Sequence, residues 1–521
     1  MIEISQVSTP IDEELSIKHI ANKLSCQEKC IHDFTILKES IDARKNNVKF
    51  IYTVLAQVDN EEKFLHYQFV KRKLLDRKAP LQLLNKMEHP PIVVGFGPAG
   101  MFAALRLAMA GCNPIVIERG SAVDKRVEDV ENFWNNKILN NESNVQFGEG
   151  GAGTFSDGKL TTRIKDEKVS FILNALVDAK ADKKILYQAH PHIGTDKLRE
   201  IVKNIRNRII ELGGKIYFDT KFISFKEENN KKLVITNKQS FICNDIILCI
   251  GHSAKDTIKQ LHYDNIKIEP KNFAVGLRIE HLQELIDKQR YHSLANHPRL
   301  KSAEYRLSHT SKNKRGVYTF CMCPGGLVIP SSCDDNLLVV NGMSNSKRDQ
   351  KNANSAILVQ VFKEDYYKDD VMDGFRYLES LEKQTFELGG SDYSAPIQTV
   401  QDFINNKITT KLNKTKPSYC MGVKFANLRD LFSDEINEAL IEGLNNFNTK
   451  IKGFSEDAIL TAVESKSSCP IRILRNEYFE SVSHPGIYPC GEGAGYAGGI
   501  ISSGVDGVRC AEALIMKHNK K

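Results

Sequence analysis

The chain has 521 residues, which is too many for one ordinary domain and corresponds to about three domains of roughly 150 residues each. Hydrophobic residues make up 41% and charged residues 26%, an ordinary composition for a globular enzyme. The net charge of +7 is a small difference between 72 basic and 65 acidic residues, so it does not indicate a chain built to bind nucleic acid.

The first twenty residues contain no basic segment followed by an apolar stretch, so we expect no secretory signal. No run reaches the length of about 18 apolar residues that marks a membrane helix. The twelve cysteines show no framework spacing, which favours a reducing compartment. We therefore expect a cytoplasmic protein with no membrane partner.

Residues 1–88 are expected to form a small α+β module of the ferredoxin-like kind, with helices at 13–24 and 37–44 and a strand at 48–58. The module ends with a basic segment, KRKLLDRK, at 71–78. We interpret this segment as a solvated helix face, and the alternative is a surface for nucleic acid or a protein partner.

Residues 92–120 predict a dinucleotide-binding unit, because an apolar strand, a glycine turn, a helix, a second strand and an acid follow one another without interruption. Gly95, Gly97 and Gly100 fill the three positions of G-x-G-x-x-G. They permit the tight turn, the approach of a pyrophosphate and the close packing of the helix, respectively. Glu118 stands where a carboxylate binds ribose hydroxyls and repels a 2′-phosphate. The unit predicts an unphosphorylated ribose and leaves NAD and FAD open.

The middle of the chain is assigned to the first part of the dinucleotide-binding domain, 89–265, and to a substrate or cap domain, 266–450. The glycine-rich loop at 144–163 can bring backbone N–H groups onto an anion. A buried strand at 245–250 returns the chain to the dinucleotide sheet and ends at Gly251. The elements expected before it are helices at 122–137 and 196–212 and strands at 215–218, 221–226 and 233–236.

Residues 451–521 are expected to complete the dinucleotide-binding domain. Within them, 486–515 predicts a strand, a turn around Glu492 and a helix from Gly498. Two remote nucleotide-facing elements indicate one long ligand, and FAD spans both because its flavin reaches the second element. Glu492 is expected to accept hydrogen bonds from the ligand, and the N–H groups at 499–501 to stabilise negative charge on the reduced ring.

Seven segments carry a family resemblance: GFGPAGMFAAL (95–105), FGEGGAGTFSDGKL (147–160), GHSAKDT (251–257), FCMCPGG (320–326), SYCMGVKFANLRDLF (418–432), SSCPIRI (467–473) and CGEGAGYAGGIISSGVDG (490–507). On these segments the chain resembles the uncharacterised FAD-dependent dehydrogenases, a family of bacterial flavoproteins. The resemblance implies an α/β fold: a glutathione-reductase-type Rossmann FAD-binding domain, an inserted mixed α+β substrate or cap domain, and a small N-terminal ferredoxin-like module.

The resemblance also implies the residues that bind FAD. Those on the AMP side are Gly95, Gly97, Pro98, Ala99, Gly100, Glu118 and Arg119. Those between the pyrophosphate and the flavin are Gly153, Ser156, Asp157, Gly158 and Lys159, and Phe222 offers its backbone to the adenine. The remaining cofactor-binding candidates are Gly251, Gly491, Glu492, Gly498, Gly499, Ile500 and Ile501. Cys469 stands where the family motif has a serine.

No motif identifies the catalytic side chains. Residues 121–160 contain no cysteine, so the redox cysteine pair of glutathione-reductase-type disulfide enzymes is not supported. Cys321 and Cys323 in FCMCPGG are candidates either for thiol chemistry near the flavin or for packing. No second cysteine or histidine pair accompanies them, so we expect no metal.

Three further residues are candidates with a structural alternative. His252 follows the strand-end glycine and is either an acid or base near the cofactor or a hydrogen-bonded turn residue. Arg472 either clamps a carboxylate or forms an ion pair. Tyr496 either covers the flavin ring or packs in the turn.

The leading hypothesis is an FAD-dependent oxidoreductase that moves a hydride between flavin N5 and a small organic substrate. Only one dinucleotide fingerprint is present, so NAD(P)H as an electron donor would bind transiently and would not occupy a second dinucleotide-binding domain. The alternatives are a flavin-dependent RNA-modifying protein that uses the N-terminal module, which the balanced charge disfavours, and a non-catalytic FAD-binding redox sensor or scaffold. The sequence leaves the oligomeric state open.

Overall fold

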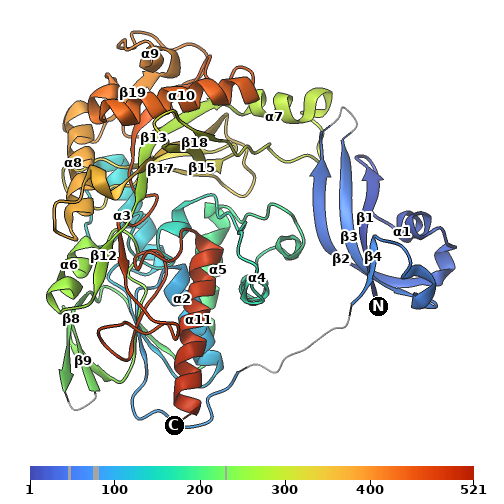
Figure 1. Cartoon of the computed structure of the whole chain (residues 1–521), viewed down its shortest axis with the longest axis horizontal. Helices are drawn as coiled ribbons and strands as arrows, with labels where there is room; N and C mark the ends of the chain where they lie inside the picture. Colours follow the sequence, from blue (N-terminus) through green and yellow to red (C-terminus); the bar gives the residue numbers. More distant parts are fainter. Residues whose placement is uncertain (45–47, 74–80, 229–230, 521) are drawn as a thin grey trace.

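A computed structural model describes residues 1–44, 48–73, 81–228 and 231–520 of the chain. These residues form three parts, which Figure 1 shows together: an N-terminal module, a domain built on a parallel sheet, and a cap built on a larger sheet. In the described residues, no helix has both the length and the apolar character required to cross a membrane.

The N-terminal module is a four-stranded antiparallel sheet in the order β2-β3-β1-β4. Its elements are β1 (Ile2–Pro10), α1 (Ile17–Leu24), η1 (Glu28–Cys30), β2 (Ile31–Asp42), β3 (Lys49–Val58), η2 (Glu61–Phe64) and β4 (Val70–Arg72). A ferredoxin-like fold carries a second helix before its last strand. In this chain the short turn η2 is the helical element described there.

Two predictions in this module need correction. The helix predicted at 37–44 is wrong, because these residues continue strand β2 and pair with β3, and sheet pairing overrides a local helical pattern. The helix predicted at 13–24 is shorter, since α1 starts after its N-cap, Ser16. Most of the basic segment 71–78 lies outside the described residues.

The second domain is built on a five-stranded parallel sheet in the order β23-β11-β5-β6-β7. The central strand β5 is buried on both faces, which explains its uninterrupted apolar sequence. Helices α2, α5 and α11 cover one face, and the antiparallel sheet β10-β9-β8 with α6 covers the other. The elements are β5 (Ile92–Val94), α2 (Pro98–Met109), β6 (Ile115–Ile117), α3 (Val123–Asn136), η3 (Ala152–Phe155), α4 (Lys168–Asp178), η4 (Lys183–Leu186), α5 (Thr195–Glu211), β7 (Lys215–Tyr217), β8 (Phe222–Glu228), β9 (Lys231–Thr236), β10 (Ser240–Cys243), β11 (Ile246–Leu248), α6 (Lys255–Tyr263), β23 (Ile487–Pro489) and α11 (Ile500–Asn519).

The sequence predicts this domain well. The helices predicted at 122–137 and 196–212 are confirmed as α3 and α5, each to within one residue at either end. The predicted strands between 215 and 250 are confirmed as β7, β8, β9 and β11 to within two residues at either end. Helices α4 and α6 and the short strand β10 are elements that the sequence analysis missed.

The cap is built on a seven-stranded sheet in the order β14-β15-β18-β13-β21-β19-β20. Strand β21 pairs with both β13 and β19, so this sheet uses residues beyond position 450, where the sequence analysis ended the cap. The pair β12–β22 joins the cap to the parallel-sheet domain. The elements are β12 (Ile268–Pro270), β13 (Phe273–Leu282), α7 (Gln283–Tyr291), η5 (His292–Leu294), β14 (Ser308–Thr310), β15 (Gly316–Cys323), β16 (Leu327–Pro330), β17 (Val340–Met343), β18 (Asn352–Val361), η6 (Lys363–Asp365), α8 (Asp373–Leu388), β19 (Ala395–Thr399), α9 (Val400–Ile404), β20 (Val423–Phe425), η7 (Leu428–Leu431), α10 (Asp434–Lys450), β21 (Ile459–Glu464) and β22 (Ile471–Ile473).

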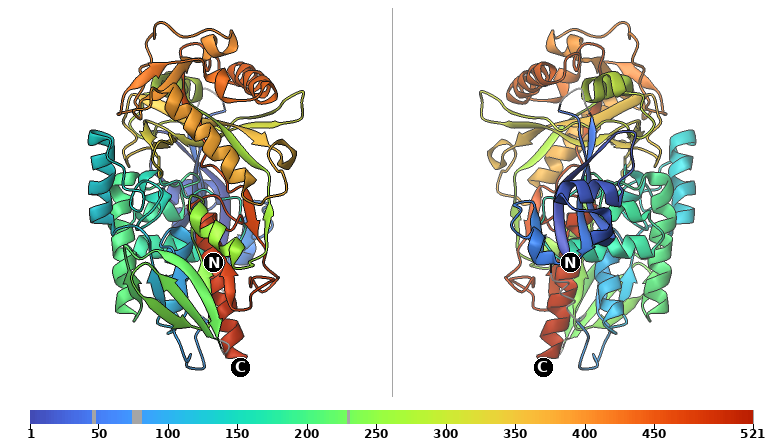
Figure 2. Two further views of the ribbon diagram at one scale, coloured as in Figure 1. Left: turned by 90° about the vertical axis from the view of Figure 1, so that its left-hand side faces the viewer. Right: turned by 90° about the vertical axis from the view of Figure 1, so that its right-hand side faces the viewer.

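The N-terminal module is docked on both other parts, and the right-hand view of Figure 2 shows it in front of them. On the parallel-sheet domain, Glu39 of β2 exchanges backbone hydrogen bonds with Tyr187 (2.7 Å) and Ala189 (2.8 Å). On the cap side, the Arg299 guanidinium donates to the carbonyls of Ile11 and Glu13, both at 2.7 Å. These contacts hold the module against both of the larger domains.

The close packing of α2 on the sheet can be tested by a substitution at Gly100. A Cβ at this position would lie 1.9 Å from the carbonyl oxygen of Gly95, so Gly100→Ala forces α2 away from β5. We expect a loss of about 1–3 kcal/mol or more in the free energy of unfolding, measured by urea denaturation. Gly316→Ala is the matched control, because its Cβ would meet nothing closer than 3.6 Å. Equal stability of the two variants would contradict this packing.

Candidate functional site

A cavity of about 2010 Å³ runs along the carboxyl edge of the parallel sheet and is lined by all three parts of the molecule. The carboxyl edge of an open α/β sheet is where such folds bind their ligands. A pocket for one small ligand measures roughly 300–1,000 Å³. The cavity is therefore large enough for a cofactor and a second molecule.

The glycine turn after β5 forms one wall of this cavity. Gly95 has φ +95°, and a Cβ there would lie 2.3 Å from the carbonyl oxygen of Cys249 on the neighbouring strand. Gly97 is the N-cap of α2, and a Cβ there would meet nothing closer than 3.7 Å. The first glycine is thus required by the protein, whereas the second leaves space for a ligand at a helix N-terminus.

Glu118 lines the cavity but is already held by the backbone. Its carboxylate accepts hydrogen bonds from the N–H groups of Phe96 (2.7 Å), Gly120 (2.9 Å) and Gly148 (3.0 Å). A carboxylate has about four lone-pair sites, so one remains for a ribose hydroxyl. Glu118 therefore fixes three loops around the cavity in addition to the ribose role predicted from the sequence.

Arg119 lies in a network of charges at the end of the cavity near Phe222. It is paired with Glu142 (2.7 Å) and with both oxygens of Asp256 (2.9 and 3.1 Å), and it stacks over the ring of Phe147. Lys221 binds the same two carboxylates. The network holds the chain that precedes Phe222 against the sheet edge, and Phe222 itself lines the cavity.

The glycine-rich loop that follows α3 is held from within by Arg126, which is fully buried. Its guanidinium donates to the carbonyls of Asn144 (2.8 Å), Val145 (2.9 Å) and Glu149 (2.6 Å). A Cβ at Gly148 would lie 2.4 Å from Arg126 Cδ. The loop conformation therefore depends on a cation that the sequence analysis did not single out.

Asp157 has a different role from the one the resemblance implies. Its carboxylate is buried and forms a bidentate ion pair with Arg348 of the cap, which also donates to Glu304 at 2.7 Å. Asp157 is absent from the cavity wall, while Gly158 and Lys159 lie on it. Asp157 thus joins the glycine-rich loop to the cap instead of facing the ligand.

Helix α11 directs its N-terminus into the same cavity as α2. Its N-cap is Gly499, and Gly498 to Ser503 line the cavity.

Glu492 also lines the cavity and accepts no side-chain hydrogen bond from the described residues. Burial raises the pKa of Glu492 to about 7, against the opposing charge of Lys271. At neutral pH this carboxyl group can therefore donate or accept a proton.

Seventeen of the twenty predicted cofactor-binding residues line the cavity. They are Gly95, Gly97, Pro98, Ala99, Glu118, Arg119, Gly153, Ser156, Gly158, Lys159, Phe222, Gly251, Glu492, Gly498, Gly499, Ile500 and Ile501. The other three are behind the wall: Gly100 packs on Gly95, Gly491 donates its N–H to Asp506 (2.8 Å), and Asp157 binds Arg348.

His252 lies on the cavity wall and is buried. Its Nε2 contacts the carbonyl of Ser468 at 3.0 Å, and burial lowers its pKa to about 3. Its Nδ1 has no hydrogen-bond partner in the described part of the protein. A buried ring whose pKa is this low is neutral at physiological pH, which fits a structural role better than proton transfer.

Arg472 and Tyr496 lie away from the cavity and contact each other. The Arg472 guanidinium is 5.4 Å from the Tyr496 ring, and its nearest carboxylate is Glu269 at 3.8 Å. The Tyr496 hydroxyl donates to the carbonyl of Ile473 at 3.0 Å, with Arg475 stacked on its ring at 3.7 Å. These contacts match the structural alternative for both residues.

Cys321 lines the cavity, and Cys323 is buried behind it. The Cys323 thiol donates to the carbonyl of Cys321 at 3.3 Å, and Arg278 donates to the Cys323 sulfur at 3.4 Å. Arg278 is fully buried and is paired with Glu464 at 3.0 Å. Only Cys321 is thus part of the cavity wall, and a buried ion pair lies behind it next to Cys323.

Several basic side chains on the outer part of the cavity were missed by the sequence analysis. Arg163, Lys184, Arg290, Lys301 and Arg306 line it and form no ion pair within the described ranges. Burial lowers the pKa of Lys301, and the nearby charges of Arg348 and Lys184 lower it further. These residues come from separate loops and helices, so no local motif could have revealed them.

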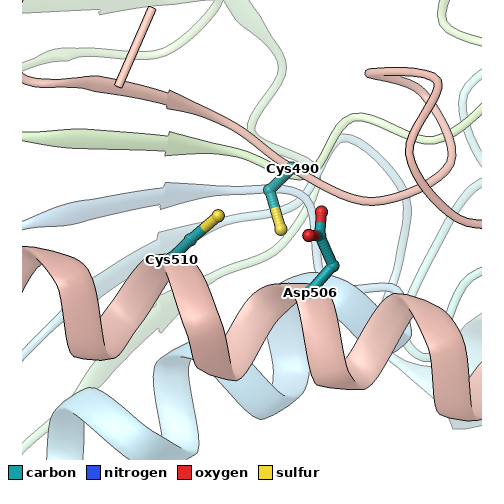
Figure 3. A group of neighbouring side chains, drawn as sticks. All are labelled: Cys490, Asp506 and Cys510. Carbon is teal, nitrogen blue, oxygen red and sulfur yellow. The ribbon is translucent and has the colours of Figure 1, made fainter. Parts of the chain in front are cut away.

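A cluster of possible metal ligands lies beside the cavity, where Figure 3 shows Asp506 and Cys510 pointing from α11 toward Cys490. Asp506 is already occupied, because it accepts from Arg475 (2.7 and 2.9 Å) and from the Gly491 N–H. Burial raises the pKa of both thiols well above the usual value, which keeps them protonated. The cluster anchors α11 to the turn that carries Glu492.

Fold and cavity together define a dinucleotide-binding α/β protein with a covered ligand site. Residues 272–467 match the family model described as FAD-dependent protein, C-terminal domain-like, and residues 1–57 match a domain of unknown function, DUF8436. A protein of Clostridium beijerinckii described as uncharacterized is 46% identical, over 99% of this chain and 99% of its own length. The chain belongs to this family of FAD-dependent proteins, and the family supports FAD as the cofactor.

Solved flavoprotein structures resemble the chain more distantly. CtdE in complex with FAD is 11% identical over 82% of this chain and 84% of its own, with a TM-score of 0.33. Tetracycline destructase Tet(51) is 11% identical over 82% of both chains, with a TM-score of 0.35. A thioredoxin reductase from Gloeobacter violaceus is 12% identical over 32% of this chain and 38% of its own, with a TM-score of 0.19.

The raised pKa of Glu492 predicts a pH-dependent stability. Between about pH 4.5 and pH 7 the folded protein binds more protons at this group than the unfolded chain, so the group's contribution to stability falls as pH rises. The substitution Glu492→Gln removes the titrating group, and with it the loss of stability as the pH rises. In flavin-free protein, we expect the Tm of the variant minus that of the wild type to increase across this range and to level off above it. Glu477→Gln, at an exposed site, controls for loss of a charge, and a pH-independent difference for Glu492→Gln would contradict the prediction.

Proposed function

We propose that the protein is an FAD-dependent oxidoreductase that transfers a hydride between flavin N5 and a small organic substrate. The observation that carries the proposal is the single cavity that extends from the Gly95–Gly97 turn, past the N-terminus of α11, to the cap and the N-terminal module. It offers a cofactor site and, continuous with it, room for a second molecule.

The residues of the cavity fit FAD. The N-terminus of α2, beside the open space at Gly97, suits a pyrophosphate. The free lone pair of Glu118 suits a ribose hydroxyl. The N-terminus of α11 would stabilise negative charge on the reduced ring. When bound, FAD supplies the electron transfer, and these residues hold it in place.

The outer cavity supports an anionic substrate. Its five basic residues form no ion pair in the described chain. Burial lowers the pKa of Lys301, and the neighbouring charges of Arg348 and Lys184 lower it further, so a bound carboxylate or phosphate would stabilise its charged form. NAD(P)H, which carries phosphates, is compatible with these charges as a transient electron donor. The proposal does not require nucleic acid.

Gly97→Ala tests the cofactor site. The added methyl group meets no protein atom closer than 3.7 Å, so folding should be unaffected, but it occupies space needed by the pyrophosphate. We expect FAD affinity, measured by isothermal titration calorimetry, to fall at least about tenfold, which corresponds to roughly 1.4 kcal/mol, with an unchanged Tm of the flavin-free protein. Failure of the wild-type protein to bind FAD would refute the proposed function.

The charge of the substrate can be tested by salt dependence. Reoxidation of the reduced, FAD-loaded protein would be followed by stopped flow with neutral and carboxylated benzoquinones. We expect the rate with the carboxylated acceptors to fall several-fold between about 0.01 and 1 M ionic strength, and the rate with neutral acceptors to change little. Lys301→Gln should weaken this dependence. Identical salt profiles for both kinds of acceptor would contradict an anionic substrate.

A further inference from the structure

We propose that Cys321 and Cys323 form a redox-active dithiol that reduces a small disulfide substrate with two electrons from the flavin. This inference rests on the proposed function, because the bound flavin is the electron donor, and it assigns the substrate class of the same cavity. The evidence is the position of the two thiols, the charge fixed beside them, and their unequal access to the cavity.

The backbone places the two cysteines in different environments. Strand β15 pairs regularly with β18 up to Phe320, and its register then shifts before Cys323 pairs with Asn354. Cys321 lies in this bulge with φ +43°, a left-handed conformation that few non-glycine residues adopt. Bulges of this kind redirect a side chain next to a functional site. The result is one thiol on the cavity wall and one buried directly behind it.

The two cysteines contact each other. The Cys323 thiol donates to the Cys321 carbonyl at 3.3 Å, and each thiol shifts the pKa of the other. Both are free in the structure. An accessible cysteine with a buried cysteine two residues further on, bonded to its backbone, is the arrangement of an attacking and a resolving thiol.

Arg278 supplies the charge that a thiolate requires. Its guanidinium is held by Glu464, Asn354 and the carbonyl of Cys321, and Gly342 leaves room for it, since a Cβ there would lie 2.0 Å from Arg278 Nη2. The hydrogen bond from Cys323 lowers the pKa of Cys321, and the charge of Arg278 lowers it further. The hydrogen bond with Cys321 and burial raise the pKa of Cys323. These directions favour the thiolate on the accessible sulfur, with Arg278 bonded to the carbonyl of Cys321 and to the sulfur of Cys323.

The reaction follows from this order. The Cys321 thiolate attacks one sulfur of R–S–S–R, the substrate S–S bond breaks, and the first R–S⁻ leaves and takes up a proton. Cys323 then loses its proton and attacks the Cys321 sulfur, which expels the second R–S⁻ and leaves a Cys321–Cys323 disulfide. Two electrons from the reduced flavin and two protons restore the dithiol.

A second thiol pair in the chain provides a matched comparison. Cys26 and Cys30 of the N-terminal module also interact electrostatically, but neither lines the cavity. Burial raises the pKa of Cys26, in contrast to that of Cys321. Exposed Cys420 serves as a single-thiol control.

The experiment is an anaerobic dithionite titration of the FAD-loaded protein after mild oxidation with 5,5′-dithiobis(2-nitrobenzoic acid), an anionic disulfide. We expect the wild type to take up four electrons per FAD, two for the flavin and two for the disulfide, and Cys321→Ser to take up two. Cys420→Ser and the double variant Cys26→Ser/Cys30→Ser should still take up four. Peptide mapping of the oxidised wild type should find a Cys321–Cys323 disulfide, and Cys323→Ser should retain a mixed disulfide on Cys321.

The outcomes separate this inference from the proposed function. Uptake of two electrons by a wild type that binds FAD, with no Cys321–Cys323 disulfide in the map, would overturn the dithiol and leave the flavoenzyme intact. Failure to bind FAD would overturn the proposed function, whereas the peptide map of the flavin-free protein would still decide whether the dithiol forms. The map of the wild type needs no substitution, so a variant that fails to fold does not affect it.

Discussion

The ion pair between Arg348 and Asp157 is the interaction on which the arrangement of the site depends. Both side chains are buried, and removal of one partner from such a pair costs about 3–5 kcal/mol because the other charge is left uncompensated. Arg348 belongs to the cap and Asp157 to the glycine-rich loop. Through Glu304, which binds Arg348 and Lys159, the same network extends to the cavity wall. The distance between the cap and the parallel sheet is fixed at this point.

With that distance fixed, each part of the molecule contributes a different element of the site. The parallel sheet provides two helix N-termini, those of α2 and α11, at one edge. The cap provides the thiols and the buried Arg278, and the N-terminal module closes the basic outer region. None of the three has a complete site alone, since the cavity is bounded by all of them. Because each part supplies different residues of the site, the ligand-binding space lies between all three.

The sequence predicts the features that depend on neighbouring residues. The strand, turn and helix at 92–109 are local, and Gly95, Gly97 and Gly100 have the positions that their spacing implies. The partners of Glu118 could not be predicted, because two of them are separate loops brought together by folding. Asp157 and Arg348 are 191 residues apart in the chain, so their pairing leaves no local signal.

Contacts between distant parts of the chain also explain the other features that the sequence did not predict. The bulge that turns Cys321 toward the cavity arises from pairing between β15 and β18, and the sequence FCMC alone is equally compatible with a regular strand. The local pattern of residues 37–44 is typical of a helix. Their strand conformation is imposed by pairing with β3, which the local pattern does not reveal. Strand β21 continues the cap sheet past 450 for a similar reason: its neighbours β13 and β19 lie far before it in the chain.

The order of strands in the parallel sheet has a consequence for how the protein is made. Strand β23 is an edge strand that pairs only with β11, yet the entire cap is synthesised between them. Domains generally fold in the order in which they leave the ribosome. A nascent chain that has completed its cap therefore still exposes the hydrogen-bonding edge of β11 and the apolar face that α11 will cover, and both are surfaces at which unfinished chains associate. The topology therefore leaves this edge unpaired until β23 and α11 have been synthesised.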